Sequence, residues 1–263
     1  MTSSALDKGG SVEEATVSAA PVAPRATTDE RGFGPRLVGM LLEPREEFPA
    51  IVARPRFWLP LVCWMVLGMA LTAVWMQNVD PREFMRSQIE QSGHADRIPA
   101  DRMEQVIDSQ SGFFKVMGWV SPVAFPLVMT LALAGLFLLV FRFFYAGELS
   151  FPQSMAIVAW SFFTVKLVTI PVTLLVMFLK GDWNVNPEEA VQAGASLFFD
   201  RATTSKPLYA LMSSLDLFSF WILWLLATGY SLAVRRPVAS TAVGVVGLWA
   251  IYVLGKVALS AFF

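Results

Sequence analysis

The sequence is poor in the residues that carry most protein chemistry. Its 263 residues include one histidine, His94, and one cysteine, Cys63. A single cysteine excludes an internal disulfide, and one histidine with one cysteine does not supply the three or four ligands of a zinc site. No spaced nucleophile accompanies His94, and no glycine-rich phosphate loop follows a predicted strand. These shortages predict a protein without a catalytic site, a metal site or a cofactor.

Charge is also scarce. Charged residues make up 16% of the chain, against about 25% in soluble domains. The formal net charge is −1 and no basic arm is present, so a nucleic-acid partner is not expected. Hydrophobic residues instead make up 55% of the sequence, which is too apolar for an ordinary soluble domain.

Five long apolar runs account for this composition. The clearest covers residues 57–76, twenty residues without an ionisable side chain. About twenty residues at a rise of 1.5 Å match a hydrocarbon core roughly 30 Å thick. The other runs cover residues 113–141, 151–179, 208–234 and 238–263. The pattern predicts an all-α, polytopic membrane bundle of five transmembrane helices, because the alternating ten-residue segments of a membrane β-barrel are absent.

Prolines and short connections organise these runs. Pro122, Pro126 and Pro171 are expected at kinks or at the starts of membrane segments. The connections 142–150 and 235–237 are short, so we expect the second and third runs, and the fourth and fifth, to form helical hairpins.

The first 32 residues differ from the rest. They are rich in Ser, Thr, Ala, Pro and charges and show no apolar periodicity, so we expect a disordered cytoplasmic tail before a membrane domain at residues 33–263. The tail has no apolar core of a signal peptide, and its second residue is Thr2 rather than the glycine that myristoylation requires. A short docking motif within it is an alternative.

The Lys and Arg residues beside the runs predict the orientation. One side has the denser group, and the other has a group spread over more than sixty residues. The dense group predicts a cytoplasmic N-terminus and, after five crossings, a C-terminus outside. The dense group is Arg31, Arg36, Arg45, Arg54, Arg56, Arg142, Arg235 and Arg236; the other is Arg82, Arg86, Arg97, Arg102, Lys180, Arg201 and Lys206.

The outer loops contain helix-start signals. Residues 80–83 (Asp-Pro-Arg-Glu) and 186–189 (Asn-Pro-Glu-Glu) each place a cap, a first-turn proline and a third-position glutamate in order. Between them, residues 103–110 lead into Phe113 at helical spacing. These patterns predict three short amphipathic helices, which either form a lid over a cavity or simply cover the loops.

Lys166, Asp216 and Lys256 are charged residues within the third, fourth and fifth apolar runs, although residues 217–234 alone are long enough for the fourth span and would leave Asp216 outside it. Ionisable groups in lipid are costly and normally face a bundle interior or water. The functional hypothesis is a proton or substrate relay; the alternative is a structural ion pair or snorkelling at the outer interface. Asp216 and Lys256 are equally distant from the turn near Arg236, so we predict that they pair at one depth, with Lys166 as the second choice of partner.

Two other patterns permit more than one interpretation. Glu46-Glu47 resembles the glutamate pair of some intramembrane proteases, but the required histidines are missing. We interpret the pair as the first turn of an interface helix with Phe48, Ile51 and Val52 facing lipid. The fifth run has a stripe of small residues, which predicts packing within the bundle or a homo-oligomer seam. These residues are Ser240, Gly244, Gly247, Gly255 and Ala258.

Several segments together resemble bacterial Yip1-domain membrane proteins. They are residues 41–44 (LLEP), 57–60 (FWLP), 146–151 (AGELSF) and 215–221 (LDLFSFW). The resemblance covers roughly residues 33–263 and includes the five-span count. It implies a helical bundle with a cytoplasmic N-terminus and supplies no catalytic residues. Eukaryotic members are linked to Rab GTPases, vesicle traffic and membrane shaping, but no Rab partner is inferred here.

These patterns lead us to expect a non-enzymatic, multi-pass protein of the cytoplasmic (inner) membrane. Its expected role is membrane organisation or protein interaction, with the lipid bilayer and unidentified membrane or cytoplasmic proteins as partners. The alternative is a transporter or channel component for a small solute or lipid, with Lys166, Asp216 and Lys256 along its path. No inverted repeat supports that alternative.

Overall fold

A computed structural model of the chain describes residues 32–92, 98–191, 193–199 and 203–262. The predicted disordered tail and His94 therefore lie outside the described residues, apart from Gly32. Within the described residues the chain is helical, with one isolated β-bridge and no strand. The elements in chain order are α1 (Phe33–Leu42), α2 (Pro44–Ala53), α3 (Trp58–Asn78), α4 (Pro81–Ser92), α5 (Ala100–Phe143), α6 (Phe151–Lys180), α7 (Pro187–Ala190), η3 (Ala195–Phe198), α8 (Lys206–Met212), α9 (Leu217–Val234) and α10 (Val238–Phe262).

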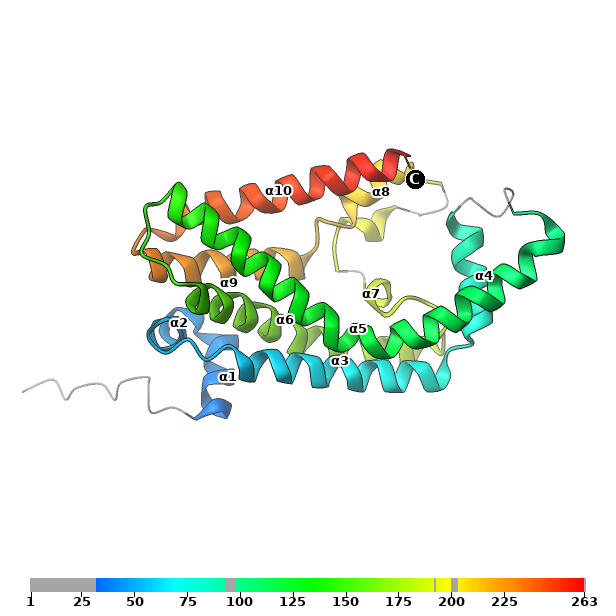
Figure 1. Ribbon diagram of the computed structural model, residues 1–263, viewed down its shortest axis with the longest axis horizontal. Helices are drawn as coiled ribbons and strands as arrows, with labels where there is room; N and C mark the ends of the chain where they lie inside the picture. The colour runs from blue at the N-terminus through cyan, green and yellow to red at the C-terminus, as the bar shows by residue number, and fades with distance from the viewer. Residues whose placement is uncertain (1–31, 93–97, 192, 200–202, 263) are drawn as a thin grey trace, which may run out of the picture.

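Five of the described helices are long and apolar enough to cross a membrane, as predicted: α3, α5, α6, α9 and α10. They run along the long axis of the molecule (Figure 1). The 18 residues of α9 span about 27 Å, close to the thickness of a hydrocarbon core. The 44 residues of α5 would span about 66 Å if straight, so α5 must bend or project from the bilayer.

Helix α5 changes direction near its middle (Figure 1). Pro122 and Pro126 lie near the midpoint of its sequence, and a proline inside a helix removes a backbone hydrogen bond and crowds the preceding turn. The bend comes close to α3, where a Cβ added to Gly68 would lie 3.5 Å from Cβ of Pro122. The kink expected in α5 is therefore present. Pro171 lies inside α6, which continues through it.

The core is built around α6, which packs against α2, α3, α5 and α9. The Tyr230 ring of α9 is fully buried and stacks on Phe141 of α5, with ring centroids 4.4 Å apart. The Tyr230 hydroxyl lies 2.7 Å from Ser154 Oγ of α6. The Ser154 hydroxyl also donates to the Ala134 carbonyl of α5 at 2.7 Å. Buried bonds of this kind join helices inside a membrane, where apolar surface alone drives little association.

Helices α1 and α2 lie across the ends of the spanning helices, at one end of the molecule (Figure 1). The prediction that Phe48 and Ile51 face lipid is wrong, because both are fully buried. A Cβ on Gly229 of α9 would come within 2.9 Å of the Phe48 ring and 2.6 Å of Ile157 of α6. Phe48 thus fills the space between α6 and α9, which only the packing of three helices creates.

The same end carries the connections 142–150 and 235–237, and we call it the α1–α2 end. Tyr145 Oη donates to the Ser240 carbonyl at 2.7 Å, and Gln153 Nε2 donates to the Val52 carbonyl at 3.1 Å. The opposite end, with α4, α7 and α8, is the α4–α8 end. Helix α1 and the C-terminal part of α10 lie at opposite ends, which suits an odd number of crossings (Figure 1).

The helix-start signals at residues 80–83 and 186–189 are confirmed, but the helices differ from the prediction. Asp80 Oδ1 accepts from the backbone N–H groups of Arg82 (2.9 Å) and Glu83 (3.3 Å) and caps α4. Asn186 Oδ1 caps α7 by accepting from Glu188 N at 3.0 Å, but α7 is a single turn. The third predicted helix, residues 103–110, is not separate: it forms early turns of α5.

Candidate functional site

The polar cluster that contains two of the predicted charged residues lies where the fourth apolar run breaks. The sequence predicted a fourth apolar run at 208–234, of which residues 217–234 alone could cross the membrane. The chain leaves helical conformation between α8 and α9, and α9 covers those residues. Residues 213–216, Ser-Ser-Leu-Asp, form this break. Residues with hydroxyl and carboxylate side chains favour such breaks because they compete for backbone hydrogen bonds.

Asp216 is the N-cap of α9. Its Oδ1 accepts from the backbone N–H groups of Phe218 at 2.9 Å and Ser219 at 3.0 Å, and Oδ2 accepts from the Ser219 hydroxyl. A carboxylate here satisfies N–H groups that lack helical partners and faces the positive end of the helix dipole. The physical role of Asp216 is therefore to start the span rather than to place a charge within it.

Lys256 reaches the same break from α10. Its Nζ donates to Ser213 Oγ at 3.0 Å and to Ser214 Oγ at 3.2 Å. Both serine hydroxyls donate in turn to the Ala210 carbonyl, at 3.1 and 2.8 Å, near the C-terminus of α8. A cation is favoured at that end because unpaired carbonyls make it negative. The half-buried ammonium thus completes the end of α8.

Asp216 and Lys256 were predicted to lie at the same depth, which is correct, and to form an ion pair, which is wrong. Both lie at the α8–α9 break, but in the described part of the chain they do not form a salt bridge within 4.0 Å. Equal depth did not fix the direction of the side chains, because the carboxylate turns toward the N–H groups of its own helix.

Lys166 does not join this cluster. It lies halfway along α6 and is partly exposed, and among the described residues its ammonium forms no hydrogen bond or ion pair. Ser154 and Ala134 are level in the antiparallel pair of α6 and α5, so twelve further residues along α6 bring Lys166 level with Pro122. The one mid-span lysine thus lies at the depth of the bend in α5.

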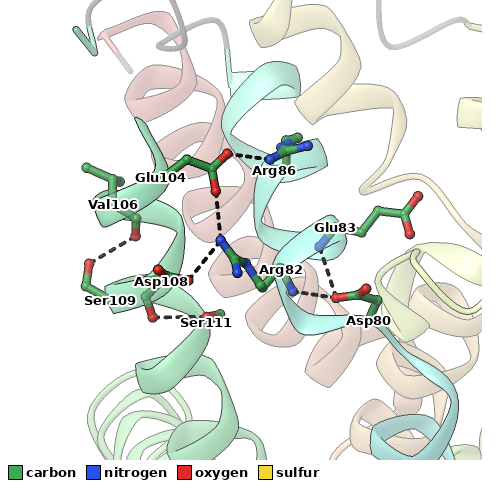
Figure 2. Close-up of polar contacts among 9 residues, drawn as sticks. All are labelled: Asp80, Arg82, Glu83, Arg86, Glu104, Val106, Asp108, Ser109 and Ser111. Carbon is green, nitrogen blue, oxygen red and sulfur yellow. Dashed lines mark hydrogen bonds and ion pairs between the residues drawn. The ribbon is translucent and has the colours of Figure 1, made fainter. Parts of the chain in front are cut away.

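A second polar cluster joins α4 to the projecting start of α5. Figure 2 shows Arg82 and Arg86 of α4 directed toward Glu104 and Asp108 of α5. Arg82 Nη2 lies 2.7 Å from Glu104 Oε2 and 3.1 Å from Asp108 Oδ1, and Arg86 Nη2 lies 2.6 Å from Glu104 Oε1. All four side chains are more than half exposed, so each pair is worth little. Together they hold the α4–α5 hairpin.

A buried charge at the α1–α2 end was missed by the sequence analysis. The Glu47 side chain of α2 has no exposed surface, and its Oε2 lies 3.7 Å from Arg36 Nε of α1. The carboxyl group packs on the bare backbone of Gly39, where a Cβ would lie 2.7 Å from the Glu47 Cδ. The available signal in the sequence was Arg36 and Gly39 before the turn and Glu47 after it. This spacing does not predict that the Glu47 side chain is buried.

The described residues contain no group of three or more His, Cys, Asp or Glu side chains placed to hold a metal ion. Cys63 is partly buried in α3. The polar groups of the described chain are thus engaged mainly at helix ends and between neighbouring helices.

The described residues form five long apolar helices, of which α6 and α9 begin at a side-chain cap, and they contain no strand. These features define a polytopic α-helical membrane protein. The pattern of the Yip1 domain matches residues 38–259. The chain therefore belongs to the Yip1 domain family, as the resemblance at residues 41–44, 57–60 and 215–221 suggested. A comparison with curated proteins and with solved structures gave no match.

Proposed function

We propose that this protein is a non-enzymatic membrane-organising or protein-interaction module of the Yip1 family. The observation that supports this most is that Lys166 lies apart from Asp216 and Lys256. Asp216 and Lys256 are engaged at the ends of α9 and α8, while Lys166 lies apart from them on α6. A relay needs its groups within hydrogen-bonding reach of one another or of a chain of water, whereas an organising bundle needs them only to complete its helices.

We also propose the bacterial cytoplasmic (inner) membrane as its location, with the N-terminus in the cytoplasm and the C-terminus outside. The density of arginines at the α1–α2 end supports this orientation. Reporter fusions after Arg56 and after Phe263 are expected to report opposite sides of the membrane. The same side for both contradicts the odd number of crossings.

Partners of this module are best found in the native membrane. The tagged full-length chain is crosslinked in intact membranes, solubilised and purified, and the attached proteins are identified. We expect one or a few discrete partners, or a second copy of the chain. A chain that crosslinks to lipid alone and runs as a monomer overturns the interaction role.

A second copy of the chain is one expected partner because part of the small-residue stripe on α10 has no neighbouring atoms within the described chain. A Cβ on Gly247 or Gly255 of α10 would meet no other atom within 4 Å, while Gly244 is covered by Tyr145. Gly247→Leu is expected to reduce any homo-oligomer found by crosslinking, with Gly135→Leu as a control at another open position on α5.

The transporter alternative is supported by one observation, the partly exposed Lys166 at the depth of the α5 bend. Proteoliposomes that contain wild type or Lys166→Met separate the two functions. The organising role predicts no solute or lipid flux from either protein. A flux that disappears in Lys166→Met, while Lys115→Met retains it, favours the transporter.

A further inference from the structure

The exposed arginines at the α1–α2 end differ from the other charges of the molecule. Six exposed arginines gather there against three exposed glutamates, Glu43, Glu46 and Glu148, among the described residues. The six are Arg45, Arg54, Arg56, Arg142, Arg235 and Arg236. The remaining described glutamate of α2, Glu47, is buried beside Arg36 and does not neutralise the surface.

Most of these guanidinium groups remain available. In the described part of the chain, the side chains of Arg45, Arg56, Arg235 and Arg236 form no ion pair. Arg142 donates through Nε to the Leu149 carbonyl at 3.0 Å, which fixes the side chain and leaves its terminal nitrogens for another acceptor. An unpaired positive surface of this kind attracts anions.

Large apolar side chains lie directly beside the arginines. Trp58, which follows Arg56 and Phe57, is 62% exposed, and Phe143 and Phe144, which follow Arg142, are 80% and 81% exposed. Leu42 of α1, 76% exposed, adds to this set. Exposed aromatic rings next to arginines are typical of the level where acyl chains meet headgroups. Helices α1 and α2 lie across the spanning helices at this end (Figure 1).

We propose that the α1–α2 end binds anionic phospholipid, with the phosphate groups on the arginines and the acyl chains against Trp58, Phe143, Phe144 and Leu42. A guanidinium group holds a phosphate through two parallel N–H···O bonds, and the four exposed apolar side chains beside the arginines hold the acyl chains. The excess of arginine over exposed glutamate selects a headgroup with net negative charge over a zwitterionic one. This inference concerns lipid selectivity and goes beyond the proposed function, which stands without it.

The test measures lipid retention by the purified full-length protein. Detergent-solubilised protein is titrated with dioctanoyl phosphatidylglycerol or dioctanoyl phosphatidylcholine, and bound lipid is counted by native mass spectrometry. We expect wild type to bind the glycerol lipid at least tenfold more tightly than the choline lipid, and added salt to weaken this preference. Equal binding of the two lipids overturns the proposal.

Matched variants locate the binding. We expect the preference for phosphatidylglycerol over phosphatidylcholine to fall at least tenfold in the triple variant Arg45→Gln/Arg142→Gln/Arg235→Gln. The control is the triple variant Arg102→Gln/Lys115→Gln/Lys180→Gln, which removes the same charge from exposed positions elsewhere. We expect this variant to keep the lipid preference. Equal losses in both variants indicate a general effect of net charge and overturn the site.

A charge-conserving variant covers the case in which the glutamine variant does not fold. Arg45→Lys/Arg142→Lys/Arg235→Lys keeps the charge and loses the two-point contact, so an intermediate preference is expected. An unchanged phosphatidylglycerol preference in the lysine variant contradicts the two-point contact between guanidinium and phosphate.

Discussion

The two ends of the bundle use arginine in opposite ways. At the α4–α8 end, Arg82 and Arg86 are held by Glu104 and Asp108 at 2.6–3.1 Å. At the α1–α2 end, Arg45, Arg235 and Arg236 form no ion pair with the described residues, and the carboxylate of Glu47 is buried.

The difference shows that charge has a different structural use at each end. At the α4–α8 end, ion pairs connect α4 to the start of α5. This part of α5 extends past the other helices, so the counter-charges come from within the α4–α5 hairpin. At the α1–α2 end the buried side chains of Phe48 and Ile51 hold the helices together, so we expect Arg45, Arg235 and Arg236, which form no ion pair with the described residues, to add little stability. We therefore expect core substitutions to matter most at the α1–α2 end and charge substitutions to matter little at the α4–α8 end.

The largest effect is expected from Phe48→Ala. The ring is fully buried between α6 and α9, so its removal leaves a cavity and should cost about 3–5 kcal/mol of unfolding free energy. Thermal unfolding in detergent measures the change. Leu42→Ala, on the neighbouring helix and 76% exposed, is the control and should change stability little. Equal effects of the two substitutions contradict the buried position of Phe48.

The next effect is expected from Glu47→Ala. Removing the carboxylate leaves Arg36 beside a desolvated space, at a cost of about 3 kcal/mol. Arg36→Met/Glu47→Met should recover much of this loss, because neither charge is then left without its partner. A double variant whose loss equals the sum of the losses of Arg36→Met and Glu47→Met measured singly shows that the pair does not interact.

A smaller effect is expected at the α8–α9 break. Asp216→Ala removes the N-cap of α9 and should cost about 1 kcal/mol, whereas Asp216→Asn keeps the acceptor and should cost much less. Unfolding of the two variants in one detergent makes the comparison. If asparagine is as damaging as alanine, the charge of Asp216 matters more than its cap.

The smallest effect is expected from Glu104→Gln. Its pairs with Arg82 and Arg86 are more than half exposed, so the loss should stay below about 1 kcal/mol and shrink further as salt is added. Hydrogen exchange of α4 should rise, since the hairpin loses its main charged contacts. A loss larger than that of Glu47→Ala would reverse the comparison between the two ends.

Local features were the ones that the sequence predicted. The lengths of α3, α6, α9 and α10 follow from runs of apolar residues, and the caps at Asp80 and Asn186 follow from residues within four positions of each other. The same rule would have found Ser150 and Gln153, which form a reciprocal capping box at the start of α6. The start of α5 was less predictable because a polar, projecting segment continues into an apolar one without a break.

The sequence by itself thus determined which segments enter the membrane, where several helices begin, and the depth at which Asp216 and Lys256 lie. Each of these depends on the chemistry of one continuous segment and its length. Tertiary structure decided that Phe48 and Glu47 are buried and that Lys256 bonds to Ser213 and Ser214. Those outcomes depend on how each helix is rotated about its axis, which is set by the packing of side chains from several distant segments at once.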